Sequence, residues 1–240
     1  MSALKISDMV GRHGLLQAVK GLSLDIPEGE TLAVIGANGA GKTTMMRMIA
    51  GLHPVAEGEI ALAGTPITQM PAHARLKAGI AMSPEGRRLF EDMSVRENLM
   101  IAAENGRRGD WTLASVCDAF GQITPLLDRA AGGLSGGQRQ AVAIGRALVA
   151  NPSVLLLDEV SLGLSPAAVE GLYQSLEGLK GHLTMIVVEQ DLTRAMAFAD
   201  RIICLAEGII ELDGKPQDLT RQQITDAYFG IHKTPEGGHA

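Results

Sequence analysis

The sequence predicts an α/β fold in which a parallel sheet carries crossover helices and is preceded by antiparallel strands. Apolar runs at residues 153–157, 183–188 and 201–205 alternate with helical segments, as in parallel sheets. Near the N-terminus, short apolar stretches alternate with turn residues, which favours antiparallel strands. Residues 94–150 have helical periodicity with little strand signal. This segment therefore predicts a helical region inserted into the sheet.

The individual elements follow from local signals. We expect antiparallel strands at residues 3–10, 17–26 and 31–35, and a further short strand at 57–63. A helix at 44–51 should end at Gly51, with Pro54 beyond it. Another helix should start at Ser165-Pro166, because serine caps helices and proline suits their first turn. The polar residues 231–240 predict a loose tail.

Composition excludes several classes of protein. The chain has 240 residues, 46% of them hydrophobic, which suits one domain with a sizeable core. A net charge of −6 leaves no basic surface, so we expect no nucleic-acid partner. No apolar run approaches the roughly 20 residues of a membrane span, and the start lacks the apolar core of a secretory signal. Cys117 and Cys204 lie far apart, which predicts buried thiols in a reducing cytoplasm.

A glycine-rich stretch from Gly36 to Thr43 has the pattern of a phosphate-binding loop. Its amides and the following helix N-terminus should surround a β-phosphate, because glycines allow close approach. Lys42 would reach the β- and γ-phosphates, Thr43 would bind Mg²⁺, and Thr44 would donate to the α-phosphate. A surface loop with an exposed lysine is the alternative. The expected nucleotide contacts are Gly36, Asn38, Gly39, Ala40, Gly41, Lys42, Thr43 and Thr44.

Two carboxylates follow the apolar run at 154–157. The run predicts a strand buried on both faces, so Asp158 and Glu159 would lie at its carboxyl end, where open α/β sheets bind ligands. Asp158 would hold Mg²⁺, directly or through water. Glu159 would act as the general base for the attacking water. Two solvated carboxylates in a turn are the alternative.

The five residues Leu134-Ser135-Gly136-Gly137-Gln138 precede a helix and make a second anion-binding helix terminus. Together with the phosphate loop before them and the acidic pair after them, they resemble the signature of ATP-binding cassette (ABC) ATPases. The resemblance covers essentially the whole chain. It implies that two cassettes pair head to tail, so that Ser135, Gly137 and Gln138 of one act on ATP held by the other.

The same resemblance implies the ABC ATPase fold. This is a P-loop NTPase (RecA-like) core with an N-terminal antiparallel β subdomain and an inserted α-helical subdomain. We expect a single domain over residues 1–240, with the core at about 1–85 and 151–230. The helical signature subdomain would occupy about 86–150, and 231–240 would be the tail.

Four positions depart from the usual pattern of this family. Where the family usually has an aromatic ring that stacks on adenine, this chain has His13, and where it has a glutamine after the second segment, this chain has Glu85. The usual aspartate after the acidic pair is replaced by Ser165, and the usual switch histidine by Gln190. His13 is either an adenine platform or an exposed loop residue. Glu85 keeps an oxygen for Mg²⁺ or the lytic water but adds negative charge. Gln190 can donate to the γ-phosphate but cannot take up a proton near neutral pH; both could also be surface residues.

The strings at residues 83–90, 158–165 and 187–190 narrow the resemblance to the second ATPase subunit of branched-chain amino acid importers (LivF type). Val160 in place of the usual proline is a mild deviation. The resemblance implies a sister ATPase partner in a homo- or heterodimer, with the heterodimer favoured, and two polytopic permease subunits. A periplasmic binding protein would take part indirectly, and the chain would be peripheral at the cytoplasmic face of the inner membrane.

Other interpretations stay open at this stage. The permease would dock where Arg87, Arg88, Leu89, Phe90 and Met93 line a groove, unless these residues only pack the helical region. Importers of urea or short amides share the local strings. A soluble ABC protein of translation or DNA repair would carry paired cassettes or long insertions, and a small-molecule kinase would leave the signature unexplained.

Overall fold

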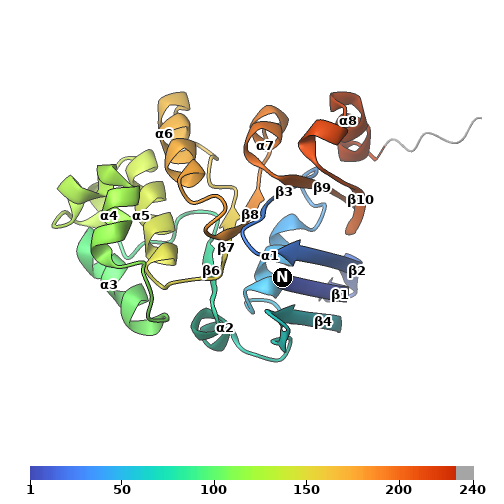
Figure 1. Ribbon diagram of the computed structural model, residues 1–240, viewed down its shortest axis with the longest axis horizontal. Coiled ribbons are helices and arrows are strands. Elements are labelled where there is room, and N and C mark those ends of the chain that lie inside the picture. Colours follow the sequence, from blue (N-terminus) through green and yellow to red (C-terminus); the bar gives the residue numbers. More distant parts are fainter. Residues whose placement is uncertain (231–240) are drawn as a thin grey trace, which may run out of the picture.

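The computed structural model describes residues 1–230, and the tail predicted for 231–240 lies outside the described residues. An antiparallel sheet lies at one side of the molecule, with strand order β2-β1-β4-β5 (Figure 1). Its buried side chains, such as Leu4, Ile6 and Val19, share a core with the methionines of the first helix. The strands are β1 Ser2–His13, β2 Leu16–Pro27, β4 Glu57–Leu62 and β5 Thr65–Pro66.

A second sheet of six strands runs through the middle, with order β10-β9-β3-β8-β7-β6. Neighbouring strands pair in parallel from β9 to β6, and β10 adds an antiparallel edge. Strand β3 Thr31–Ile35 belongs here, so its assignment to the antiparallel group was wrong. It is buried at all five positions, as a central parallel strand requires. The others are β6 Ile80–Ser83, β7 Val154–Asp158, β8 Thr184–Val188, β9 Arg201–Ala206 and β10 Ile209–Gly214.

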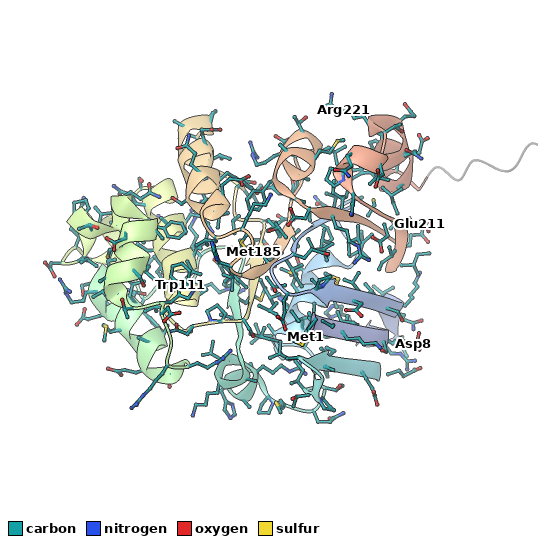
Figure 2. The ribbon with its side chains drawn as sticks, in the orientation of Figure 1. Met1, Asp8, Trp111, Met185, Glu211 and Arg221 are labelled. Carbon is teal, nitrogen blue, oxygen red and sulfur yellow. The ribbon has the colours of Figure 1, made fainter. Side chains whose placement is uncertain are left out.

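Helices α3, α4 and α5 lie together at one end of the molecule (Figure 1). The apolar cluster that they share with the central sheet includes Ile144 of α5 and extends to Met185 of β8. Figure 2 shows Met185 near the centre of the molecule and Trp111 on the side where these helices lie. The helices are α1 Lys42–Ile49, α2 Ala72–Ala78, α3 Val95–Asn105, α4 Leu113–Ala119, α5 Gly136–Leu148, α6 Pro166–Glu177, α7 Leu192–Phe198 and α8 Arg221–Tyr228, with short 3₁₀ turns η1 Gly121–Leu126, η2 Ala131–Gly133 and η3 Pro216–Asp218.

Side-chain caps explain where several helices start. Ser94, Thr112, Ser135 and Thr220 each form a capping box with the residue three positions later. Ser165 caps α6, with Pro166 in its first turn, as the sequence predicted. The first helix starts at Lys42 and ends at Ile49, two residues earlier at each end than predicted.

Candidate active site

The loop between β3 and α1 turns through two glycines, Gly36 and Gly41, that no other residue could replace without a clash. Gly36 and Gly41 have φ of +146° and +103°, in the region that L side chains rarely adopt. A Cβ at Gly36 would lie 2.2 Å from the carbonyl oxygen of Leu205, and one at Gly41 would lie 2.4 Å from that of Ala18. The backbone of this loop therefore packs directly against β2 and β9, which fixes its shape.

Lys42 opens α1 and is only 5% exposed. Its Nζ donates to the carbonyl oxygens of Gly36 and Ala37, at 2.6 and 3.0 Å. Burial lowers the pKa of Lys42, although the charges of Glu159 and Asp158 oppose this shift. The loop thus holds the ammonium group in place on its own carbonyls.

The acidic pair lies at the carboxyl end of β7, beside the start of α1. The hydroxyl of Thr43 donates to Oδ1 of Asp158 over 3.4 Å. Asp158 is 1% exposed, and burial, together with the charges of Glu159 and Glu85, raises its pKa to about 6. Glu159 has a φ of +50°, so the chain leaves the extended conformation of β7 at this residue.

A pocket of about 590 Å³ lies above these groups. It brings together ten predicted site residues from the β1–β2 turn, the phosphate loop, and the segments that follow β6, β7 and β8. Leu16, Ala18 and Leu162 also line the pocket and were not predicted. Leu16, at the start of β2, and Leu162, in the turn after β7, are exposed apolar residues. The ten are His13, Asn38, Gly39, Gly41, Lys42, Thr43, Thr44, Glu85, Glu159 and Gln190.

The other predicted residues of this pocket lie just behind its wall. Gly36 contacts Lys42 through its carbonyl, and Asp158 contacts Thr43. Ala40 is buried, and its carbonyl accepts the amide of Gly208. Thr43 and Asp158 offer oxygens side by side, which is the donor chemistry that Mg²⁺ prefers when phosphates and water supply its other ligands. These residues therefore fit a magnesium ion.

His13 stands at the β1–β2 end of the pocket. Its Nε2 lies 3.1 Å from the hydroxyl oxygen of Thr44, and its ring centroid lies 4.5 Å from that of His53, with the planes tilted by 37°. The sequence interpretation did not include His53. His53 therefore packs against the ring of His13, and of the two only His13 lines the pocket.

The signature residues do not line the pocket of their own chain. Ser135 caps α5 by accepting the amide of Gln138 at 3.3 Å, while the amide of Ser135 donates to Oε1 of Gln138 at 3.0 Å. A Cβ on Gly137 would lie 2.8 Å from that of Ala168, so α5 approaches α6 closely. This helix terminus is thus separate from the pocket, as an action on another chain requires.

The predicted docking residues divide into two groups. Arg87 and Leu89 turn inward, Arg87 to hydrogen bonds and Leu89 to the helical core. Arg88 is exposed, Phe90 is 51% exposed, and Met93 is partly exposed. Arg88 and Phe90 are therefore the most exposed of the five, and the permease contact at this surface stays a prediction.

An ABC transporter family model matches residues 19–161. This chain belongs to the ABC transporter family. It is the ATP-binding ATPase component of that family, and ATP is its nucleotide. In residues 1–230 no helix is long and apolar enough to cross a membrane.

Relatives of this ABC ATPase belong to transport systems with different substrates. It is 36% identical to the high-affinity branched-chain amino acid transport ATP-binding protein BraG of Pseudomonas aeruginosa, over 91% of this chain and 95% of BraG. It is 36% identical to the probable branched-chain amino acid transport ATP-binding protein LivF of Archaeoglobus fulgidus, over 83% and 86%. It is 38% identical to the α-glucoside transport protein AglK of Rhizobium meliloti, over 91% of this chain and 61% of AglK.

A solved ABC cassette has the same fold. It is a dimer in a post-hydrolysis state with ADP and Pi bound, and it aligns with a TM-score of 0.78 at 27% identity. The alignment covers 89% of this chain and 98% of that one.

Proposed function

We propose that this ABC ATPase drives import of branched-chain amino acids. The observation that carries the ATPase part is the pocket that joins Lys42, Thr43, Glu85, Glu159 and Gln190. The observation that favours this substrate class is the match to BraG, which extends over nearly all of both chains, while the match to AglK covers 61% of that protein. Import of urea, short amides or another amino acid is the alternative.

In this proposal the pocket binds Mg²⁺-ATP with its phosphates on the loop. Lys42 contacts the β- and γ-phosphates, Thr44 the α-phosphate, and His13 stacks on adenine. Thr43, Asp158 and Glu85 hold the ion, directly or through water, and the ion would neutralise phosphate charge. Glu159 takes the proton of the attacking water, and Gln190 donates to the γ-phosphate.

Ser135, Gly137 and Gln138 complete the site of a second cassette. Two cassettes would pair head to tail, most simply this chain with a different sister ATPase, beneath two polytopic permease subunits at the cytoplasmic face of the inner membrane. A periplasmic binding protein would deliver the substrate. ATP binding would close the dimer of cassettes and hydrolysis would release it, so the γ-phosphate would set this switch. We assign residues 86–150 to the subdomain that carries the signature and the permease contact.

Reconstitution with the permease subunits encoded beside the gene tests this function. The complete transporter in liposomes should take up radiolabelled leucine, isoleucine and valine only when ATP is inside and a loaded binding protein is outside. Uptake of urea or acetamide, but not leucine, would replace the substrate class with the alternative. Uptake that persists when Lys42→Ala is combined with the same change at the corresponding lysine of any different partner cassette would contradict the ATPase role.

A further inference from the structure

Glu189 is a buried carboxylate that the proposed reaction leaves unused. It follows β8, it is 2% exposed, and it directly precedes Gln190, which lines the pocket. Its Oε2 accepts the backbone amide of Gln190 at 3.1 Å and that of Asp191 at 3.4 Å. Its Oε1 accepts the hydroxyl of Tyr173. A buried carboxylate is costly unless it is hydrogen-bonded, and here both oxygens are occupied.

Tyr173 reaches this carboxylate from α6 and is itself fixed in place. Its ring packs edge-on against Phe198, with centroids 4.9 Å apart and planes at 89°. The guanidinium carbon of Arg194 lies 5.3 Å from the ring centroid, and its Nη1 lies 4.0 Å from Oε2 of Glu189. Two side chains of α7 therefore contact the tyrosine ring that α6 carries, and the hydroxyl of this ring is directed at Glu189.

The segment after β8 is consequently held by the hydrogen bonds that the successive backbone amides of Gln190 and Asp191 donate to Glu189. Asp191 caps α7 by accepting the amides of Thr193 and Arg194, at 2.9 and 3.2 Å, which fixes the far side of Gln190. The near side depends on Glu189. Gln190 itself is exposed in the pocket, so its backbone, and not packing of its side chain, sets where its amide group points.

We propose that Tyr173 and Glu189 are positioning residues for ATP hydrolysis, which hold the Gln190 side chain at the phosphate end of the pocket through its backbone. This inference rests on the proposed contact of Gln190 with the γ-phosphate. Neither residue touches the nucleotide. The chain of contacts runs from the Tyr173 hydroxyl to Oε1 of Glu189, and from Oε2 to the amide of Gln190.

A double-mutant cycle tests the inference by steady-state ATP hydrolysis. The assay uses the assembly that contains this chain, with the counterpart of Glu159 in any different partner cassette replaced by glutamine, so that only this pocket turns over. Tyr173→Phe keeps the ring but removes the hydroxyl. We expect kcat to fall about five-fold, the effect of one lost hydrogen bond, with KM for ATP unchanged. In a Gln190→Ala background the same substitution should cause no further loss, because its effect passes through Gln190.

Two further variants separate positioning from folding. Tyr228→Phe is the matched control, because Tyr228 contacts Phe229 through its ring on α8, away from the pocket, and it should leave kcat unchanged. Glu189→Gln can still accept the two amides through its oxygen and face the tyrosine through its NH₂, so it should lose less activity than Tyr173→Phe. Thermal melting confirms that each variant is folded at the assay temperature.

The outcomes are distinct. A loss in Tyr173→Phe that vanishes in the Gln190→Ala background supports the inference. An equal loss in both backgrounds, or no loss from Tyr173→Phe, overturns it. If Gln190→Ala alone hydrolyses at the wild-type rate, the proposed role of Gln190 fails, and the inference fails with it. A wild-type assembly that neither binds nor hydrolyses ATP would contradict the proposed function itself.

Discussion

Nε of Arg87 donates to Oε1 of Gln140 over 3.1 Å, which joins the segment that carries Glu85 to the signature helix α5. The same guanidinium reaches the carbonyl oxygen of Leu162 through Nη2 at 3.3 Å. Leu162 follows the acidic pair and lines the pocket. The Arg87 side chain therefore connects its own segment, which carries Glu85, to the signature helix α5 and to the turn after the acidic pair.

Arg87→Ala should lower the free energy of unfolding by roughly 1–2 kcal/mol, because it leaves Oε1 of the buried Gln140 without the hydrogen bond that Arg87 donates to it. Arg88→Ala is the matched control. Arg88 has a similar left-handed backbone, with φ of +46° against +64°, but is exposed. Urea denaturation of both variants measures the difference. Equal stability of the two would show that the Arg87 contacts contribute nothing.

Lys42→Ala should weaken Mg²⁺-ATP binding at least ten-fold, roughly the loss of one charge-assisted contact to phosphate. The loop carbonyls of Gly36 and Ala37 hold the ammonium group at the pocket, so its charge is positioned for a phosphate. Isothermal titration with ATP measures the affinity. Lys77→Ala on the exposed face of α2 is the control and should bind as the wild type does. Unchanged affinity in Lys42→Ala would mean that the pocket binds phosphate elsewhere.

Asp158→Asn should stabilise the nucleotide-free protein at pH 8 by roughly 2 kcal/mol. The pKa of Asp158 is raised to about 6 in the folded state, above its value in the unfolded chain. The folded state therefore binds the proton more tightly, and this contribution to stability is lost as the pH rises from about 4 to about 6. The gain from Asn should vanish near pH 3, below both pKa values, where the folded and unfolded states are protonated alike.

Thermal or urea unfolding at the two pH values measures this dependence. Asp118→Asn, on the exposed side of α4, serves as the control and should change stability little at either pH. A stability gain of equal size at pH 3 and pH 8 would rule out titration of Asp158 as its cause.

How much the sequence could predict depends on how local each signal was. The phosphate loop and the acidic pair were predicted because each follows an apolar strand, and parallel strands end at one edge of a sheet. Strand β3 was placed in the wrong sheet because its partners, β8 and β9, lie far along the chain and turn signals do not report pairing. Strand β6 and helix α2 were not predicted, since β6 is only four residues long.

Contacts between distant side chains were the other gap. The pairing of His13 with His53 and the bond from Tyr173 to Glu189 depend on elements that meet only in the folded chain. The hydrogen bonds of Arg87 agree with the alternative that it packs within the helical region, but its partner Gln140 lies on another element and could not be identified from the sequence.

The two ATP sites should turn over unequally if the partner is a different cassette. Glu85 and Gln190 both line the pocket of this chain, where one adds negative charge and the other cannot take up a proton. Glu159→Gln here should therefore reduce total hydrolysis less than the same change in the partner. The double replacement Glu85→Gln and Gln190→His should raise the rate of this site. Equal losses from the two glutamine variants would contradict the proposed asymmetry.

The sharing of ATP between two cassettes is tested most directly by Ser135→Arg, which places a bulky cation where α5 would approach nucleotide held by the partner. Its control is Ser94→Arg, which loses the same kind of capping box at α3, worth about 1 kcal/mol, without altering the signature. Both variants are assayed for Mg²⁺-ATP binding and for hydrolysis in the assembly that is active with the wild-type chain. We expect Ser135→Arg to bind ATP in its own pocket but to lose the hydrolysis that its signature supports in the partner's site, which is most of the total, while Ser94→Arg keeps both. Hydrolysis by Ser135→Arg at the wild-type rate would contradict the account.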